Sequence, residues 1–406
     1  MMFGRKINVL LIFFQVLNSI IAEYFIKPTK NKKLEELKNS IRSGKIKNVL
    51  ILRNDGIGDA VVSINFIKEV VKLFENVKIL SSKHNDFVFK MENIRTLIDV
   101  SGKFRKGHSK ASLMYAITTF MENVLHVFET KIKATCPKYD LIIDLKGDPS
   151  LLRKYSAKYA VGQNEGMFSL FYTYFLNTSY ALADSNLVES YQNLMKLIGI
   201  HIKVKDLPPK GFHKNKKAVT FIFVGCKSER NLKYLQWKRI ILLASKYQKC
   251  IIADDPQQNI MNILTSDIDI INNPKIELLI GYRKLNNLAE ISNESNLMIS
   301  VDGGAEHFLE RYTNALVIYT CGVYDVWKPY SETGYKKRSI ANNCAYAYTT
   351  TSIGLKKFIF YANVRCRPCY IMCGGKKCVN FLDVELLDKI LRISSNPQFE
   401  LSMTRY

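Results

Sequence analysis

The chain has 406 residues, 47% of them hydrophobic, which is enough apolar content to fill the cores of two domains. Lysine and arginine outnumber aspartate and glutamate by 59 to 36, so the formal net charge is +23. This excess favours anionic partners, whether nucleic acid, a membrane surface or phosphorylated sugars, and does not choose among them. No short-period repeat or low-complexity tract is visible, which excludes a solenoid repeat protein.

The first part of the chain, residues 1–45, is predicted to associate with a membrane. Residues 7–26 form a strongly apolar run preceded by Arg5 and Lys6, and no small-residue cleavage site is evident. Three alternatives remain open for this run: an interfacial helix, a transmembrane anchor, or a helix packed on the protein core. A polar stripe along one side of the expected helix favours the interfacial position. The stripe consists of Asn8, Gln15, Ser19 and Glu23.

A basic segment follows the apolar run. An apolar helix combined with a polybasic patch holds a protein to an anionic membrane surface, so such a surface is an expected partner. Eight basic residues stand against only two acidic ones in this segment. The basic residues are Lys27, Lys30, Lys32, Lys33, Lys38, Arg42, Lys45 and Lys47.

Beyond residue 45, short β-rich runs alternate with helical stretches, which predicts parallel sheets covered by helices. One series of strands is expected in residues 46–205 and a second in residues 218–392. The stretch 206–217 contains prolines, a glycine and lysines and is predicted to be the linker, and residues 393–406 form a tail. The expected strands are Val49–Leu52, Val77–Leu80, Leu141–Leu145, Ala218–Val224, Cys250–Ala253, Leu297–Val301 and Ala315–Tyr319.

The most informative motif is a glycine turn directly after the first expected strand. Gly56 and Gly58 let the backbone turn and approach a ligand closely, and apolar spacing predicts a helix over Ala60–Val71. A dinucleotide-binding G-x-G-x-x-G is excluded because Val61 stands three residues after Gly58. The turn ends in Asp59 at the sheet edge where open α/β folds bind ligands, and this position suits a general base. The alternative is that Asp59 caps the N-terminus of the helix.

The pattern Arg53-x-Asp55-x-Ile57-Gly58-Asp59-x-Val61 resembles the start of the family 9 glycosyltransferases, which include the bacterial heptosyltransferases of lipopolysaccharide core assembly. Further blocks follow in the order of that family, so the resemblance covers residues 46–392. The blocks are Tyr139–Gly147, Ser295–His307, Leu316–Tyr319, Asp325-x-Trp327-x-Pro329-Tyr330 and a cysteine-rich end.

The resemblance implies an α/β protein of the GT-B type, with two Rossmann-like domains facing a central cleft: an acceptor domain, 46–205, and a donor domain, 218–392. It implies an inverting transfer of heptose from ADP-heptose, which is a nucleotide-diphosphate sugar. The implied acceptor is a lipid-linked or phosphorylated lipopolysaccharide core, and the transfer is expected to need no cofactor. Asp59 is then the catalytic base, and Arg53, Asp55 and Gly58 lie on the acceptor side. Such an acceptor implies a cytoplasmic protein, peripheral on the inner face of the inner membrane.

The donor site is expected after the strand Leu297–Val301. Sugar transfer leaves a dianionic diphosphate, so the site needs positive charge or oriented N–H groups. Asp302, Gly303 and Gly304 open a helix whose free N–H groups make an anion site. The resemblance places these three residues and His307 around the phosphates and sugar of the donor. Family members commonly have threonine where Gly303 stands, and His307 has the alternative role of a helix-packing residue.

A cationic residue for the diphosphate is expected in the loop after the strand that ends at Val224. Related enzymes place a lysine seven residues before a tryptophan there, and Arg230 holds that position before Trp237. Arginine grips phosphate oxygens with two N–H groups, so it suits this role. Lys227 and Lys233 are alternatives.

The C-terminal cysteines form a compact C-x2-C-x3-C-x4-C run. Four thiolates at this spacing suit a structural zinc knuckle, and the alternative is a set of buried or loosely paired thiols. The residues are Cys366, Cys369, Cys373 and Cys378.

Two further functions remain as alternatives. One is a family 9 transferase that uses another nucleotide sugar, because the sugar and base recognised depend on loops that the motifs do not define. The other is a basic nucleic-acid-binding protein with the cysteine knuckle as its module. Few aromatic residues interleave with the basic runs and no RNP1 motif is present, so we expect no nucleic-acid partner.

Overall fold

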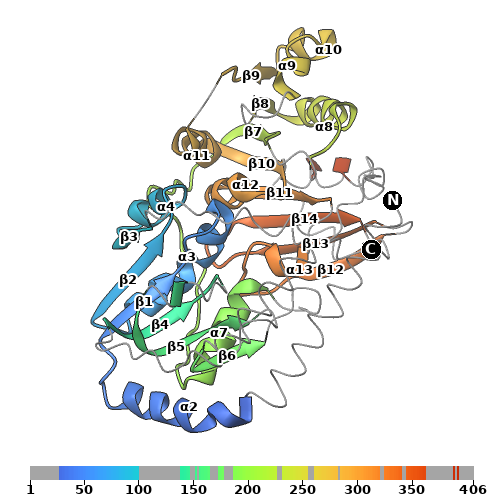
Figure 1. The fold of residues 1–406 in the computed structure, drawn as a ribbon. Coiled ribbons are helices and arrows are strands. Elements are labelled where there is room, and N and C mark those ends of the chain that lie inside the picture. The colour runs from blue at the N-terminus through green and yellow to red at the C-terminus, as the bar shows by residue number, and fades with distance from the viewer. Residues whose placement is uncertain are drawn as a thin grey trace, which may run out of the picture. The chain divides into compact units, whose positions relative to one another are not determined.

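The computed structural model divides the chain into two compact units, Met1–Val204 and Lys205–Tyr406. Each unit contains one large sheet with helices packed on it (Figure 1). The structure describes residues 27–99, 138–146, 151–152, 155–164, 172–177, 186–225, 231–254, 260–281, 284–320, 324–340, 344–362, 387–388 and 391–392.

The sheet of the first unit has the order β3-β2-β1-β4-β5-β6, and its strand pairs are all parallel. This is the strand order of a Rossmann fold, in which the direction of winding reverses between the first and fourth strands. The three strands that the sequence predicts here are confirmed within two residues at each end. The strands are β1 Asn48–Leu52, β2 Asn76–Ser81, β3 Thr96–Ile98, β4 Tyr139–Asp144, β5 Ala157–Asn164 and β6 Tyr174–Asn177.

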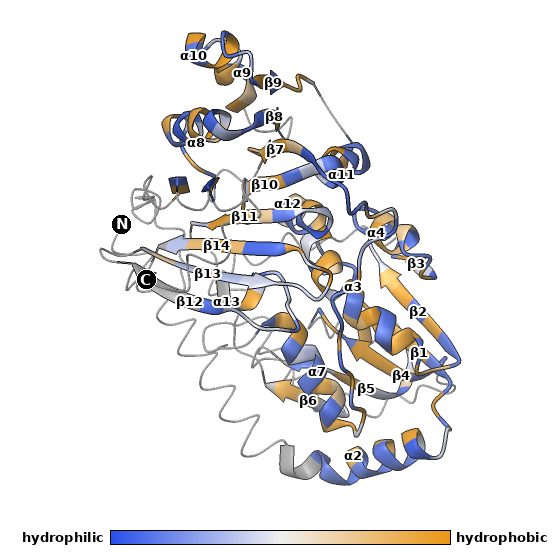
Figure 2. Cartoon of the chain, turned by 180° about the vertical axis from the view of Figure 1, so that it is seen from behind, coloured by the Kyte–Doolittle hydropathy of each residue, from blue (hydrophilic) through white to orange (hydrophobic). Residues whose placement is uncertain are grey.

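Buried apolar strands build the core of this unit, and β1 and β4 are hydrophobic along most of their length (Figure 2). Such continuous apolar runs are typical of parallel strands covered on both faces. Helix α3, Ile57–Val71, packs against α4, Asp86–Met91, and against α7, Leu187–Leu197. The predicted helix Ala60–Val71 is therefore confirmed, but it begins three residues earlier.

Helix α2, Lys27–Arg42, is formed by the basic segment that the sequence assigns to membrane association. It packs against β6, and its Leu37 is completely buried. The side-chain nitrogen of Lys30 donates to the carbonyl oxygen of Tyr172. Burial, together with the charge of Lys33, lowers the pKa of Lys30 to about 8. Part of the basic segment thus contributes to the core of the first unit.

The sheet of the second unit repeats this topology and extends it. Its order is β12-β13-β14-β11-β10-β7-β8-β9, in which β7, β8, β9, β10, β11 and β14 pair in parallel as a second Rossmann-like sheet. The antiparallel strands β12 and β13 were not predicted from the sequence. The strands are β7 Lys217–Phe223, β8 Lys249–Ala253, β9 Ile276–Leu278, β10 Ser295–Val301, β11 Asn314–Tyr319, β12 Lys336–Ile340, β13 Cys344–Thr350 and β14 Lys356–Ala362.

The core of the second unit lies between its sheet and helix α8, which buries Trp237 and Ile240 against Ile222 and Ile299. The four strands predicted here are confirmed. The remaining helices are short. The helices are α8 Tyr234–Tyr247, α9 Ile260–Leu264, α10 Ile268–Ile271, α11 Leu285–Glu294, α12 Gly304–Leu309, the 3-10 helix η3 Glu310–Tyr312 and α13 Tyr324–Trp327.

The stretch predicted as the linker, residues 206–217, lies at the start of the second unit. The Asp206 side chain is buried there and accepts hydrogen bonds from the backbone N–H groups of Glu332 at 3.2 Å and Ser352 at 3.3 Å. Asp206 therefore fixes the beginning of this stretch to the unit that follows.

The apolar run, residues 7–26, lies outside the described residues, and its three alternatives stay predictions. Among the helices that the structure describes, none combines the length and the apolar character needed to cross a membrane.

Candidate functional site

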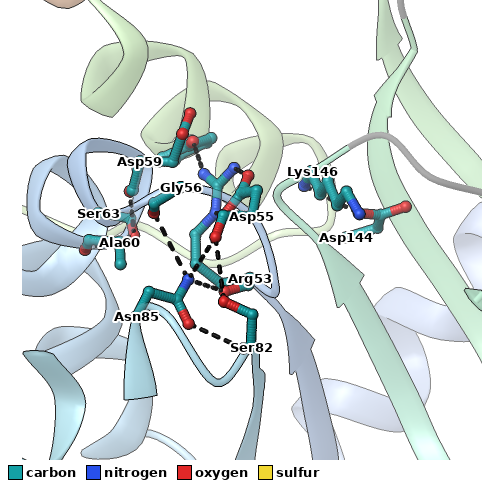
Figure 3. Close-up of polar contacts among 11 residues, drawn as sticks. Arg53, Asp55, Gly56, Asp59, Ala60, Ser63, Ser82, Asn85, Asp144 and Lys146 are labelled. Atoms are coloured by element: carbon teal, nitrogen blue, oxygen red, sulfur yellow. Dashed lines mark hydrogen bonds and ion pairs between the residues drawn. The ribbon is translucent and has the colours of Figure 1, made fainter. Parts of the chain in front are cut away.

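The carboxyl ends of β1 and β4 mark the point where the first sheet reverses its winding, which is where open α/β folds bind ligands. Leu52 pairs with Asp144 in the register of these strands, so the glycine turn after β1 lies beside the end of β4. Figure 3 shows the residues of this edge, with Asp144 and Lys146 on one side of the turn and Asp59 on the other. The structure thus brings the predicted acceptor-side residues to one position in the fold.

The glycine turn places Asp59 inside the first turn of a helix. The N-cap of α3 is Gly56, in an extended conformation, and Asp59 is the third helical residue. The alternative that Asp59 is the N-cap is therefore wrong. A Cβ at Gly56 would lie 2.7 Å from Asp59 Oδ2, so the missing side chain leaves room for the carboxylate. A negative charge in the first turn is also favoured by the helix dipole.

Arg53 links the turn to helix α7. It is almost fully buried, and its guanidinium donates from Nε to Asp55 Oδ1 at 2.9 Å and from Nη2 to Asp55 Oδ2. Its Nη1 donates to the hydroxyl of Tyr191, which is completely buried on α7. These bonds use most of the donors of Arg53, so this side chain holds the turn in place.

Two acids therefore lie at the same turn in different environments. Burial raises the pKa of Asp55 to about 7; the charge of Asp59 adds to the rise, whereas Arg53 and Lys146 oppose it. Asp55 accordingly holds its proton over much of the range in which an ordinary aspartate is ionised.

Asn85, which the sequence analysis did not single out, holds the turn in place through hydrogen bonds to its backbone. Its side-chain nitrogen donates to the carbonyl oxygens of Arg53 at 2.8 Å and Asp55 at 3.2 Å (Figure 3). Its side-chain oxygen accepts from the backbone N–H of Ser82 at 2.8 Å. Asn85 is completely buried, and it joins the end of β2 to the turn after β1.

The end of β4 carries a second buried carboxylate. Asp144 accepts from the Tyr172 hydroxyl at 2.8 Å and from the backbone N–H of Lys146 at 2.9 Å. A Cβ at Gly162 on β5 would lie 2.4 Å from a ring carbon of Tyr172 and 3.0 Å from Asp144 Cβ. Asp144 is completely buried, so it shapes the loop that carries Lys146.

The second unit has its own reversal point, between β7 and β10. The loop after β7 carries Arg230 and Lys227, which lie outside the described residues. The buried side chain of Asn231 closes this loop by donating to the carbonyl oxygen of Val224 at 2.9 Å, and it accepts from the indole N–H of Trp237 at 2.9 Å. Lys233 is exposed at the N-cap of α8.

Asp302 and His307 meet at the other side of this reversal point, after β10. Asp302 Oδ1 lies 3.6 Å from His307 Nε2, and Glu306 Oε2 lies 3.3 Å from His307 Nδ1. Gly303 is the extended N-cap of α12, and Gly304 is its first residue. Glu306 was missed by the sequence analysis, although it stands inside the quoted motif.

A buried ion pair is formed by Lys357 and Glu310, the residue that follows α12. Lys357 Nζ is 2.8 Å from Glu310 Oε2, and both side chains are at least nine-tenths buried. Burial raises the pKa of Glu306 well above its ordinary value, and the charges of Glu310 and Asp302 raise it further. Lys357 and the N–H of Gly303 oppose this rise. Two acids, Glu310 and Asp302, and one base, Lys357, thus act on Glu306 among the described residues.

One group within the described residues has donor atoms suited to a metal. Asp302, Glu306 and His307 each offer one ligand atom, and these atoms lie within 4.8 Å of one another. The four C-terminal cysteines lie outside the described residues, so the zinc knuckle stays a prediction.

Solved glycosyltransferases share the fold of this chain. It is similar to a glycosyl transferase family 9 protein from Veillonella parvula, with 17% identity and a TM-score of 0.50 over 70% of this chain and 83% of that chain. The Escherichia coli heptosyltransferase WaaC, solved with ADP, has 14% identity and a TM-score of 0.50 over 70% of this chain and 90% of that chain.

The E. coli ADP-heptose lipopolysaccharide heptosyltransferase II has 10% identity and a TM-score of 0.54 over 86% of this chain and 99% of that chain. No protein-family model and no curated protein sequence matches the chain. At these identities the similarity is one of fold: two parallel Rossmann-like sheets, consistent with the GT-B type.

Proposed function

We propose that this chain is an inverting glycosyltransferase that moves a sugar from a nucleotide-diphosphate donor to a glycan acceptor. One observation carries the proposal: a glycine turn presents the carboxylate of Asp59 at the reversal point of the first sheet. The second unit supports it, because a glycine-containing turn with Asp302 stands at the reversal point of its own sheet. Ligands bind at such points in open α/β folds.

Asp59 acts as the general base in this reaction. Its carboxylate takes the proton of the acceptor hydroxyl while the hydroxyl oxygen bonds to the anomeric carbon of the donor sugar. The bond from that carbon to the diphosphate oxygen breaks in the same step, which inverts the configuration. Arg53, Asp55 and Gly58 set the position of the turn on the acceptor side, with Arg53 held by Tyr191.

The nucleoside diphosphate leaves with two negative charges that the second unit has to neutralise. Arg230 is our first choice for this role, with Lys227 and Lys233 as alternatives, because all three follow β7 in the sequence and β7 is one of the two strands at the reversal point of the sheet. Asp302, Gly303, Gly304 and His307 contribute contacts to the donor from the opposite side of that point.

Heptose from ADP-heptose is the proposed donor sugar, and a lipopolysaccharide or lipooligosaccharide core is the proposed acceptor. The motif resemblance and the fold shared with heptosyltransferase II support this choice. Another nucleotide sugar is the second candidate. With a lipid-linked acceptor, the reaction takes place at the cytoplasmic face of the inner membrane.

Release of nucleoside diphosphate tests the activity directly. The purified chain is incubated with core acceptor and, separately, with ADP-heptose, other ADP-sugars, UDP-sugars and GDP-sugars. We expect ADP release from ADP-heptose that depends on the acceptor. Release from a different nucleotide sugar alone would replace the donor assignment, and acceptor-independent background with every donor would reject glycosyl transfer.

The role of Asp59 as the general base is tested by a separate variant, Asp59→Asn. Asp59→Asn keeps the size of the side chain and removes the base, so we expect turnover to fall by about 10²-fold or more. Donor binding and the melting temperature should stay unchanged. Glu69→Gln, on the same helix α3, is the matched control and should retain full turnover. Near-native turnover of Asp59→Asn would reject the role.

A further inference from the structure

The hydroxyl and the ring of Tyr191 contact two different parts of the segment that carries Asp59. Tyr191 lies on α7 and is completely buried. Its hydroxyl accepts a hydrogen bond from Nη1 of Arg53, the first residue after β1. Its ring packs on the ring of Phe66 on α3, with the centroids 5.3 Å apart and the planes at 45°. Asp59 stands between these two contacts along the chain, so α7 holds the segment on both sides of the candidate base.

The position of Phe66 on α3 connects its ring contact to Asp59. Phe66 follows Asp59 by seven residues, about two helical turns, so both lie on the same side of the helix. Phe66 is completely buried, which leaves its ring no room to move away from Tyr191. The guanidinium carbon of Arg53 lies 5.9 Å from the centroid of the Tyr191 ring, within the range of a cation–π contact. A change at Tyr191 therefore reaches Asp59 from both directions.

Two partners of Arg53 respond differently to pH. The pKa of Asp55 is raised to about 7, mainly by burial, and Lys146 is the other base whose charge acts on it. Burial also raises the pKa of Tyr191 well above its ordinary value. The charges of Asp55 and Asp59 raise it further, and the charge of Arg53 opposes them. The Tyr191 hydroxyl thus stays neutral and able to accept a hydrogen bond at both pH 6 and pH 8, whereas the carboxyl of Asp55 loses its charge in this range.

We propose that Tyr191 is a positioning residue for Asp59. It acts through Arg53 before the base and through Phe66 after it. The role rests on the proposed function, because it assigns Tyr191 to the transfer in which Asp59 is the base. The hydroxyl matters most at low pH, where it keeps Arg53 on α7 while the carboxyl of Asp55 is neutral. Tyr191 is completely buried, so it acts on the carboxylate without touching either substrate.

The first test is the turnover of Tyr191→Phe, which removes the hydroxyl and keeps the ring against Phe66. At pH 6 we expect kcat to fall by about tenfold or more, because a small displacement of a catalytic group has effects of this size. At pH 8 the fall should be smaller, because the ionised carboxyl of Asp55 then holds Arg53. The KM for the acceptor should change little, since the variant removes no contact with the substrate.

Two further variants identify the cause of this loss. In Asp55→Asn, residue 55 is neutral at every pH, so the addition of Tyr191→Phe should lower kcat by the same factor at pH 6 and pH 8. Tyr159→Phe is the matched control. The buried hydroxyl of Tyr159 lies 3.2 Å from Ser40 Oγ on α2, so this variant loses a hydroxyl contact elsewhere in the same unit. It should keep the kcat of the parent chain at both pH values.

Hydrogen exchange tests the same role without any substrate. Mass spectrometry follows the peptides that cover residues 53–60, where the backbone N–H of Ala60 donates to the carbonyl oxygen of Gly56 at 3.2 Å. After correction for the intrinsic exchange rate, the parent chain should protect these peptides equally at pH 6 and pH 8. In Tyr191→Phe they should exchange about tenfold faster or more at pH 6. Loss of protection at pH 6 in the parent chain would overturn the proposal even if Tyr191→Phe does not fold.

Two kinetic results would also overturn the positioning role: a kcat of Tyr191→Phe equal to that of the parent chain, or a loss by the same factor at pH 6 and pH 8. The second result would indicate a merely structural hydroxyl. Absence of turnover in the parent chain would instead reject the proposed transferase, and hydrogen exchange would still measure the link from Tyr191 to the turn. Normal turnover with unchanged exchange in the variant would reject the positioning role alone.

Discussion

The side-chain nitrogen of Asn85 lies 2.8 Å from the carbonyl oxygen of Arg53 and donates a hydrogen bond to it. This bond crosses from the segment after β2 to the turn after β1, and the same nitrogen also reaches the carbonyl of Asp55. Backbone carbonyls in a tight turn have no partner in the sheet, so a buried amide is what satisfies them. Asn85 therefore fixes the loop from which Asp59 projects.

Replacement of Asn85 should reduce both stability and turnover. Asn85→Ala removes a hydrogen-bond donor from the carbonyls of Arg53 and Asp55, although the Asp55 carbonyl keeps its bond from the Ser82 hydroxyl at 3.2 Å, so we expect unfolding to become easier by about 1–3 kcal/mol. Turnover should fall more than the KM for the acceptor rises, because the variant displaces Asp59 rather than a binding contact. Urea unfolding and steady-state kinetics measure the two effects.

Two further variants separate the hydrogen bonds from the size of the side chain. Asn85→Asp keeps the oxygen that accepts from Ser82 but loses the amide donors, so it should not restore turnover. Asn76→Ala removes an exposed asparagine of β2 and should resemble the parent chain. Equal stability of Asn85→Ala and Asn76→Ala would contradict the role of Asn85.

Some residues of the two candidate sites could be predicted from the sequence, and others could not. Asp302 was predicted because it follows an apolar strand directly, and Asp59 because it ends the glycine turn after one, so the strand pattern places both at a sheet edge. Asn85 was missed because its bonds join residues 32 positions apart, and only the pairing of β1 with β2 brings them together. No local pattern encodes such a contact.

Glu306 was missed for a different reason. At the third position of a short helix, a glutamate ordinarily faces solvent, and only the packing around α12 makes it 1% exposed. Strands β12 and β13 escaped prediction because they are antiparallel additions with mixed polar and apolar residues. Burial and pairing between distant segments decide these features, whereas the seven strands that were predicted, all of them parallel, follow from their own composition. The parallel strands β3, β5, β6, β9 and β14 were not predicted either.

Stability should depend on pH through Asp55. Burial raises the pKa of this carboxyl to about 7 in the folded chain, against about 4 in the unfolded chain. The folded state therefore holds a proton that the unfolded state has lost, and the associated stability is fully present below pH 4 and lost as the pH rises through 7.

Asp55→Asn removes this titration and isolates its effect. Its free energy of unfolding, relative to the parent chain, should increase between about pH 5 and pH 8, with a slope of at most about 1.4 kcal/mol per pH unit. Asp140→Asn is the matched control: burial alone would raise the pKa of Asp140, but bonds from the N–H groups of Asn48 and Lys47 lower it. The stability difference for that control should be constant over this range, and a constant difference for Asp55→Asn would refute the assignment.

Nucleotide binding should depend on Arg230. If this side chain neutralises the diphosphate, Arg230→Ala should weaken ADP binding by about 1.5–3 kcal/mol, as expected for a charge-assisted contact. Titration calorimetry measures the affinity, with Lys249→Ala on β8 as an exposed control. Unchanged binding in Arg230→Ala, together with a collapse in Lys227→Ala or Lys233→Ala, would move the role to that lysine.

Membrane binding should require both the apolar run and the exposed basic residues. Lys30 donates to Tyr172 and is half-buried, so the attraction to anionic lipid comes from the other basic residues, at about 1 kcal/mol each near the surface before screening. A chain that begins at Lys27 keeps α2, whose Leu37 belongs to the core, and deletes the apolar run together with residues 1–6. Co-sedimentation with anionic vesicles should capture the full chain at low salt and capture the shorter chain poorly. Capture should also weaken when the exposed Lys32, Lys33 and Arg42 are replaced by glutamine.

High salt should release the full chain from the vesicles if residues 7–26 form an interfacial helix that acts with the basic patch, because screening weakens surface attraction. Pelleting that resists high salt would instead favour a transmembrane anchor, and equal pelleting of both chains would exclude any role for residues 7–26.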